Sequence, residues 1–308
     1  MKFSMLIPLG HGDPNEFLSI DAIAAMTKAL EAANVEACFL TDHPAPSAEW
    51  LHAGGHDALD PFTALAFVAA NSTRLKMFTN VLVLPYRNPF ITAKAAATLQ
   101  ILSNGRFILG VGGGYQKTEF DALGIDFTKR GALMDEAIEV IRMAWSGEVV
   151  SKQGMNFNAI GNLPRPAPKP QPPIWIGGSS DKAVQRAARV GDGWCPYFVR
   201  AGQSKINKDT ALYTTEQLAE KITKLQELRA AHGRSGKFDI TIGPPARPEL
   251  GSRESVERYL EELHQFAEAG VTCATIVPPH PTRQVYLEYI QWFGAEVIAR
   301  FQPRRESA

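Results

Sequence analysis

The chain has 308 residues with 32 basic and 32 acidic side chains, so its formal net charge is zero and its pI is about 7.1. This balance indicates neither nucleic acid nor an anionic membrane surface as a partner. The first apolar run ends at Pro8, too short for a signal peptide, and nowhere do about 18 apolar residues follow one another. Cys38, Cys195 and Cys273 are odd in number and lie in apolar stretches, which is typical of reduced core thiols. The sequence therefore predicts a soluble, cytoplasmic protein.

Apolar runs alternate with segments of helical period along the chain. We expect strands at residues 2–7, 36–40, 75–84, 106–111, 174–176, 194–198, 238–242 and 271–277. We expect helices at residues 17–33, 60–72, 89–102, 119–123, 130–145, 182–189, 214–232, 252–269 and 282–300. Eight strands with at least eight helices predict an α/β fold, a (β/α)8 TIM barrel forming one domain over residues 1–308. A doubly wound sheet is the alternative, but it usually has fewer strands.

The clearest unit covers residues 75–115. Two strands that are apolar throughout flank a helix that Asn88 caps and that Asn104 and Gly105 end. Continuous apolar runs are typical of parallel strands buried on both faces. The second strand runs into Gly112-Gly113-Gly114, at the strand end where barrels place their ligands.

Three segments interrupt the alternation. Residues 147–157 predict a small β-hairpin turned by Gln153 and Gly154. The proline-rich residues 164–173 predict an extended crossing to the fifth strand. Residues 199–213 are polar and unpatterned, which indicates a surface insertion after the sixth strand.

The residue types at the predicted strand ends disfavour two classes of barrel enzyme. Metal hydrolases need several His and acidic ligands there, but His11, His43 and His280 form no HxH pair and have no bridging carboxylate. Schiff-base enzymes need a lysine at a strand end, and none is present. We therefore predict no metal site.

Two glycine turns are candidate binding elements. Gly177-Gly178-Ser179-Ser180 precedes a helix, so its N–H groups and hydroxyls can hold a phosphate, although a tight turn with Ser capping explains it equally well. Gly112-Gly113-Gly114 can lie against a planar ring, but GVGGGY lacks the spacing of a dinucleotide fingerprint.

Asp42 and His43 follow the second predicted strand. A histidine at a strand end followed by proline faces the pocket, and the neighbouring Asp42 can set its tautomer. The alternative is structural, with Asp42 capping the next loop and His43 as a hydrogen-bonded wall.

Taken together, five motifs in order resemble the bacterial luciferase-like oxidoreductase family, and most closely its coenzyme F420-dependent branch. The motifs are TDHP (41–44), GGHDALDPFTALAFVAANSTRLKMFTNVLVLPYRNP (54–89), GRFILGVGGGYQKTEFDALG (105–124), RGALMDEAIEVIRMAW (130–145) and PPIWIGGSSDKAVQRAARVGDGW (172–194). The resemblance implies coenzyme F420 as cofactor, with FMN as the alternative, a small-molecule substrate and a homodimer.

The resemblance also implies residue roles. A strand bulge with a non-proline cis peptide at Asn80-Val81 backs the cofactor ring, Gly113 and Gly114 lie along its edge, and Gly177, Gly178, Ser179 and Ser180 form the phosphate cradle. Asp42 and His43 lie at the reactive face, where the histidine exchanges a proton or stabilises an oxyanion.

The sequence departs from the family at Tyr115. Sugar-phosphate and alcohol dehydrogenases of the family have a glutamate there as proton donor, so those activities are not carried over. Tyr115 either donates a hydrogen bond or only forms a wall of the pocket. The resemblance implies hydride transfer between F420 and a small organic substrate. An FMN-dependent monooxygenase using oxygen and a non-catalytic ligand-binding barrel remain the alternatives.

Overall fold

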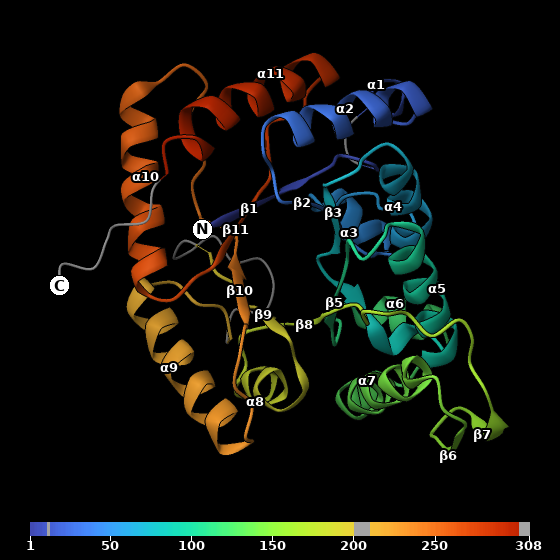
Figure 1. Cartoon of the computed structure of the whole chain (residues 1–308). Coiled ribbons are helices and arrows are strands. Elements are labelled where there is room, and N and C mark those ends of the chain that lie inside the picture. Colours follow the sequence, from blue (N-terminus) through green and yellow to red (C-terminus); the bar gives the residue numbers. More distant parts are fainter. Residues whose placement is uncertain (11–12, 200–209, 302–308) are drawn as a thin grey trace.

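The computed structural model describes residues 1–10, 13–199 and 210–301. Eight parallel strands form a closed ring, because β3 pairs with both β2 and β5 (Figure 1). They are β1 (Lys2–Leu6), β2 (Ala37–Leu40), β3 (Lys76–Thr79) with its continuation β4 (Leu82–Val83), β5 (Phe107–Gly112), β8 (Ile174–Gly177), β9 (Gly193–Cys195), β10 (Asp239–Ile242) and β11 (Cys273–Ile276). The predicted (β/α)8 barrel is confirmed. The single-domain assignment over residues 1–308 stays a prediction.

Helices surround the ring, most of them beginning at a side chain that caps the first turn. They are α2 (Ile20–Ala32), α4 (Pro61–Ala70), α5 (Pro89–Leu102), α7 (Arg130–Ser146), α8 (Asp181–Val190), α9 (Thr215–Ala231), α10 (Arg253–Glu268) and α11 (Arg283–Phe293), with short helices α1 (Pro14–Phe17), α3 (Ala48–His52) and α6 (Lys117–Ala122). Asn88 and Asp60 accept backbone N–H groups at the starts of α5 and α4, each followed by proline, as predicted.

The core has two layers. A small inner cluster fills the barrel with Leu6, Phe39, Phe78, Ile108, Trp175 and Cys195, and Val81 packs against it. A much larger outer cluster lies between strands and helices. All three cysteines are buried and unpaired, which confirms them as core thiols. Burial raises the pKa of the Cys38 thiol to about 12.

Several predicted elements differ in detail. The helix expected over residues 17–33 is broken because Leu18 ends α1 and the Ser19 hydroxyl caps α2. The strand expected over residues 75–84 is interrupted at Asn80-Val81, which is a cis peptide as the family resemblance implies. The last helix, expected over residues 282–300, is α-helical only to Phe293 and continues as a π-helix at Gly294–Ile298.

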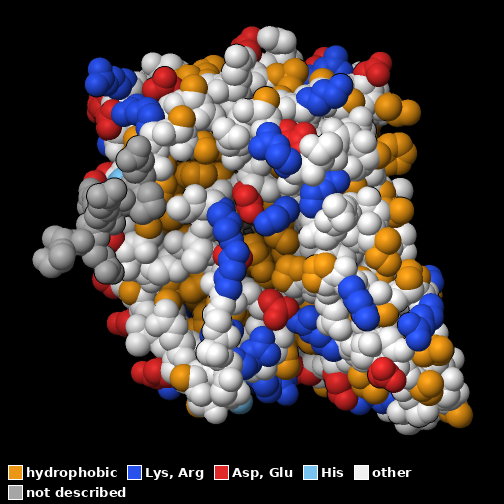
Figure 2. Space-filling model, viewed as in Figure 1, with side chains coloured by type: hydrophobic (Ala, Val, Ile, Leu, Met, Phe, Trp, Pro, Cys, Tyr) orange, Lys and Arg blue, Asp and Glu red, His pale blue; other side chains and the backbone are white. Residues whose placement is uncertain are grey.

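A hairpin and a proline-rich connector leave the barrel between α7 and β8. The predicted hairpin is present, with strands β6 (Val150–Gln153) and β7 (Asn158–Asn162), but β7 lies beyond the expected residues 147–157. The turn is at residues 154–157 and not at Gln153 and Gly154, because Gln153 pairs with Asn158 in the ladder. It projects at one corner of the molecule (Figure 1). Apolar side chains gather along that edge, over α4, α5 and the hairpin (Figure 2); they include Phe67, Ile91, Leu102 and Ile160. Most of the insertion expected at residues 199–213 lies outside the described residues.

Candidate active site

The residues predicted to form the site lie at the ends of four neighbouring strands, in the ring order β2, β3, β5 and β8. Asp42 and His43 follow β2, and Asn80 and Val81 interrupt the third strand. Tyr115 follows β5, and Gly178 follows β8. Because all strands are parallel, these ends meet at one mouth of the barrel.

Asp42 does not orient His43, contrary to the sequence prediction. Its buried carboxylate accepts hydrogen bonds from the Val83 N–H at 2.9 Å and from the two terminal nitrogens of Arg87 at 2.6 and 2.9 Å. Asp42 therefore clamps the end of β2 to the chain that follows the Asn80-Val81 interruption. Asp42 and His43 are adjacent in the chain but bind different partners.

His43 is instead held from the segment after β5. Its Nδ1 lies 3.2 Å from Oε2 of Glu119 and 3.0 Å from Nε2 of Gln116. The side chain of Glu119 is fully buried, and that of His43 is 9% exposed. Glu119 also accepts hydrogen bonds from the Ala45 N–H at 3.2 Å and from the Tyr86 hydroxyl at 3.0 Å. Glu119 on α6 therefore ties the loop after β2 and η1 (Leu84–Tyr86) together around the histidine.

Aromatic side chains enclose the imidazole. The Trp50 ring lies over it at 4.5 Å between centroids, and the His56 and Tyr115 rings meet it edge-on at 5.2 and 6.1 Å. Burial and then the nearby Glu119 raise the pKa of Tyr115 to about 12, so its phenol stays protonated at neutral pH. Burial and then His43 lower the pKa of His56 to about 4, so His56 is neutral there.

Val81 fills a notch between two glycines. A Cβ added to Gly112 would lie 2.7 Å from the Val81 side chain, and one added to Gly177 would lie 3.1 Å from it. These glycines at the ends of β5 and β8 therefore admit a side chain of the third strand. That packing joins the Asn80-Val81 element to both predicted glycine turns.

The glycines after β5 differ in the space around them. Gly114 has φ +76°, and a Cβ there would lie 2.6 Å from Val83, so only glycine fits. A Cβ on Gly113 would meet only the Met134 sulfur, at 3.9 Å. The space beside Gly113 is therefore open, as its predicted position along the edge of a cofactor ring requires.

In the turn after β8, both serine hydroxyls already form hydrogen bonds within the protein, which the sequence does not indicate. The Ser179 hydroxyl accepts the Tyr197 N–H at 2.7 Å and donates to the Tyr197 carbonyl at 3.2 Å. The Ser180 hydroxyl caps α8 by accepting the Ala183 N–H at 3.2 Å. Gly178 has φ +106°, a conformation that favours glycine. For a phosphate, the turn offers backbone N–H groups at the start of α8 more than the hydroxyls.

Sequence reasoning missed Glu119 and Gln116, which hold His43, as well as Arg87, which binds Asp42, and Tyr86, which binds Glu119. The available signal for Glu119 is an acidic residue about one helical turn after Tyr115, but by itself it predicts only the start of a helix. The order of the residues in the chain gives no hint that Glu119 contacts His43, 76 residues earlier.

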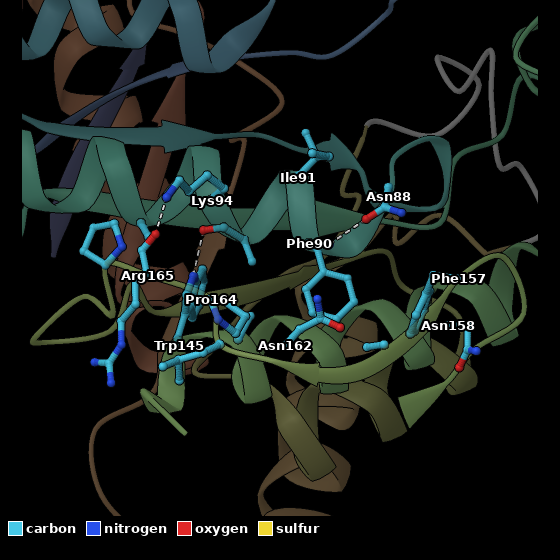
Figure 3. A pocket seen from close by; sticks show the side chains of 16 residues that line it. Asn88, Phe90, Ile91, Lys94, Trp145, Phe157, Asn158, Asn162, Pro164 and Arg165 are labelled. Atoms are coloured by element: carbon cyan, nitrogen blue, oxygen red, sulfur yellow. Dashed lines mark hydrogen bonds between the residues drawn. The ribbon is translucent and has the colours of Figure 1, made fainter. Parts of the chain in front are cut away.

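A cavity of about 640 Å³ lies away from this mouth, between α5, the end of α7 and the hairpin (Figure 3). Two of its polar side chains bind the protein itself: Lys94 donates to the Arg165 carbonyl, and the indole N–H of Trp145 donates to the Ala93 carbonyl. It includes none of the predicted site residues.

In the described ranges, no three His, Cys, Asp or Glu side chains group as metal ligands would. Among the same residues, no helix has the length and apolar character needed to span a bilayer.

Residues 1–301 match the family described as luciferase-like monooxygenase. The chain belongs to this family. An F420-dependent glucose-6-phosphate dehydrogenase of Kineococcus radiotolerans is 31% identical over 270 residues, which cover 86% of this chain and 74% of that protein. Uncharacterized mycobacterial relatives are 31% identical, and the match spans 60% of their length.

Two solved structures share the fold. The monooxygenase RslO1 from Streptomyces bottropensis has a TM-score of 0.76 and 19% identity, covering 98% of this chain and 100% of that one. An F420-dependent secondary alcohol dehydrogenase in complex with an F420-acetone adduct has a TM-score of 0.74 and 18% identity, covering 97% and 98%. At these identities the likeness supports the luciferase-like barrel alone.

Proposed function

We propose that this protein is an F420-dependent oxidoreductase that transfers hydride between the deazaflavin and a small organic substrate. Relatives about one-third identical are named as F420-dependent dehydrogenases. The observation that carries the proposal is His43 at the strand ends, fixed by Glu119 and enclosed by Trp50 and Tyr115. Such a histidine can exchange a proton with a substrate while hydride moves elsewhere.

The residues present fit a deazaflavin at this mouth. Val81 offers an apolar surface above the inner core, and Gly113 leaves room beside it. Backbone N–H groups of Ser179 and Ser180 and of the first turn of α8 would hold the phosphate. Gly177 and Gly178 would shape the turn, because the Gly178 N–H already donates to the Cys195 carbonyl at 3.0 Å. Asn80 would lie behind the ring with Val81, and Gly114 would continue its edge. When bound, the deazaflavin supplies a ring carbon that accepts or releases hydride.

Tyr115 limits the proton chemistry of the site. With its pKa raised to about 12, the phenol can donate a hydrogen bond but does not release its proton at neutral pH. His43 is then the residue that exchanges a proton with the substrate. The site differs in this respect from relatives that have a glutamate after the glycine run.

The decisive experiment is the absorption spectrum of the purified protein mixed separately with F420 and with FMN. We expect a spectral shift and tight binding with F420. Tight binding of FMN with oxygen-dependent turnover, and none with F420, would replace this proposal with a monooxygenase. Binding of neither would favour a ligand-binding barrel without catalysis.

Two variants test the residue roles once a substrate is found. His43→Ala should keep F420 and lose about 10²- to 10⁴-fold in turnover. His232→Ala, at the exposed end of α9, is the matched control and should keep both. Gly178→Asp should weaken F420 binding, because a carboxylate would face the phosphate and the residue has φ +106°. Unchanged affinity in Gly178→Asp argues against the cradle.

A further inference from the structure

We propose that Glu119 is the positioning residue for His43: its carboxylate fixes the ring proton on Nδ1 and leaves Nε2 as the site of proton exchange. The tautomer follows from the hydrogen bonds alone. Its consequence for catalysis rests on the proposed function. The Glu119 contacts tie η1 and the loop after β2 to one carboxylate on α6.

Glu119 has the bonding pattern of an ionised carboxylate. Oε1 accepts the Ala45 N–H, and Oε2 accepts the Tyr86 hydroxyl and faces His43 Nδ1. The side chain is fully buried, so water does not compete for these bonds. Burial and then Glu119 raise the pKa of Tyr86, so its hydroxyl remains a donor. Two donors already point at the carboxylate, and the imidazole is the third group in contact.

These contacts decide which ring nitrogen of neutral His43 bears the proton. A carboxylate offers only lone pairs, so a nitrogen 3.2 Å from it forms a hydrogen bond only as N–H. Nδ1 therefore bears the proton. This N–H cannot accept a hydrogen bond from Gln116 Nε2, which lies 3.0 Å away, so the amide group is assigned the opposite orientation, in which its oxygen faces Nδ1. The Glu119 contact thus sets the orientation of Gln116 as well.

Nε2 lies on the far side of the ring from Glu119. Within residues 1–10, 13–199 and 210–301 it has no hydrogen-bond partner. Trp50 lies over the ring and Tyr115 meets it edge-on, so the ring is held in place from several sides. The Nε2 lone pair would take the proton of a substrate hydroxyl or amine, and a bound deazaflavin would supply the acceptor for the hydride that leaves the substrate carbon. In the reverse direction, the Nε2 proton returns to the substrate. Glu119 then faces an imidazolium and stabilises its charge.

The first test is the tautomer itself, measured by NMR on protein containing isotope-labelled histidine. The His43 signals are assigned by their loss in His43→Gln. The measurement is made at a pH where the ring is neutral and needs neither cofactor nor substrate. We expect the Nδ1–H form in the wild type. The Nε2–H form would overturn the inference without any variant, and it would leave the F420 proposal untouched.

Glu119→Gln is the matching variant, because it keeps the shape and removes the charge. We expect it to lose the excess of the Nδ1–H form, and to lose about 10²- to 10⁴-fold in kcat with the dissociation constant for F420 unchanged. Tyr86→Phe is the control: it removes another donor from the same carboxylate, leaves the His43 contact and should keep the tautomer.

The outcomes separate the two proposals. If Glu119→Gln changes neither tautomer nor kcat, Glu119 is only a structural acid and the inference fails. If the tautomer changes but kcat does not, Glu119 does not act through His43 in the reaction. If the wild type binds no F420, the proposed function fails while the tautomer assignment stands on the NMR result. Glu119, His56 and Tyr115 are the titratable side chains that contact the His43 ring, so the NMR measurement is repeated over a pH series in which their protonation is followed as well.

Discussion

Asp42→Asn tests whether the Asp42–Arg87 pair clamps the interrupted third strand. The substitution keeps an oxygen for the Val83 N–H but removes the charge that binds both terminal nitrogens of Arg87. Removing one partner of a buried ion pair costs about 3–5 kcal/mol. The Arg87 side chain is 19% exposed, so water can solvate part of the unpaired guanidinium. We therefore expect the lower end of that range, about 3 kcal/mol.

This loss corresponds to a measurable change in melting temperature. For a chain of 308 residues, the unfolding entropy is about 0.65 kcal/mol per kelvin, so about 3 kcal/mol lowers Tm by about 5 °C. Thermal unfolding followed by far-ultraviolet circular dichroism resolves such a shift. The His43–Glu119 contact does not involve Asp42, so the variant should keep the His43 tautomer.

Asp60→Asn is the matched control, because Asp60 is the second carboxylate near Arg87. Their atoms are 3.5 Å apart, and Asp60 is 49% exposed, so this ion pair contributes at most about 1 kcal/mol. Asp60 also caps α4 through the Thr63 N–H at 2.9 Å, a role that asparagine performs equally well. We expect a drop in Tm below about 2 °C. Equal drops for both variants would refute the clamp.

Two further predictions concern packing and pH. Gly112→Ala should lower the free energy of unfolding by about 1–3 kcal/mol, because its Cβ would lie 2.7 Å from the Val81 side chain. Gly113→Ala is the control and should be nearly neutral. Urea unfolding compares the two variants, and equal losses would argue against the notch that Val81 fills. Burial lowers the pKa of His56 from 6.5 to about 4, so between these values the unfolded chain binds a proton that the folded chain does not. The free energy of unfolding should therefore fall as pH drops from 6.5 to 4, and less so in His56→Gln; identical pH profiles would contradict this.

The barrel could be predicted because its strands carry a strong local signal. Strands buried on both faces are continuous apolar runs, and the helices between them begin at capping residues that are visible in the sequence. The interruption at Asn80-Val81 could not be predicted from the local pattern, since residues 75–84 alone indicate one continuous strand. Only the family resemblance placed the cis peptide there, and the structure confirms it.

The partners of the candidate site residues could not be predicted in the same way. Asp42 and His43 are adjacent in sequence, which suggested a pair, but they bind different neighbours. The actual partner of His43 depends on where α6 begins after the turn at Gly114. Long-range contacts of this kind depend on how elements pack, and the periodicity of one segment contains no information about them.

Glu119 also bears on the role of Tyr115 in the proton chemistry of the site. From the sequence, Tyr115 leaves the acid/base pair of the related dehydrogenases incomplete, because no glutamate follows the glycine run. The structure supplies a carboxylate four residues later, but Glu119 is bound behind His43 and fully buried. It can set the basicity and orientation of the imidazole but has no exposed oxygen with which to protonate a substrate. Among the described residues around this imidazole, His56 and Tyr115 hold their protonation states near neutral pH, so we expect His43 to be the one that exchanges a proton. A site of this kind suits a reaction in which one proton accompanies one hydride.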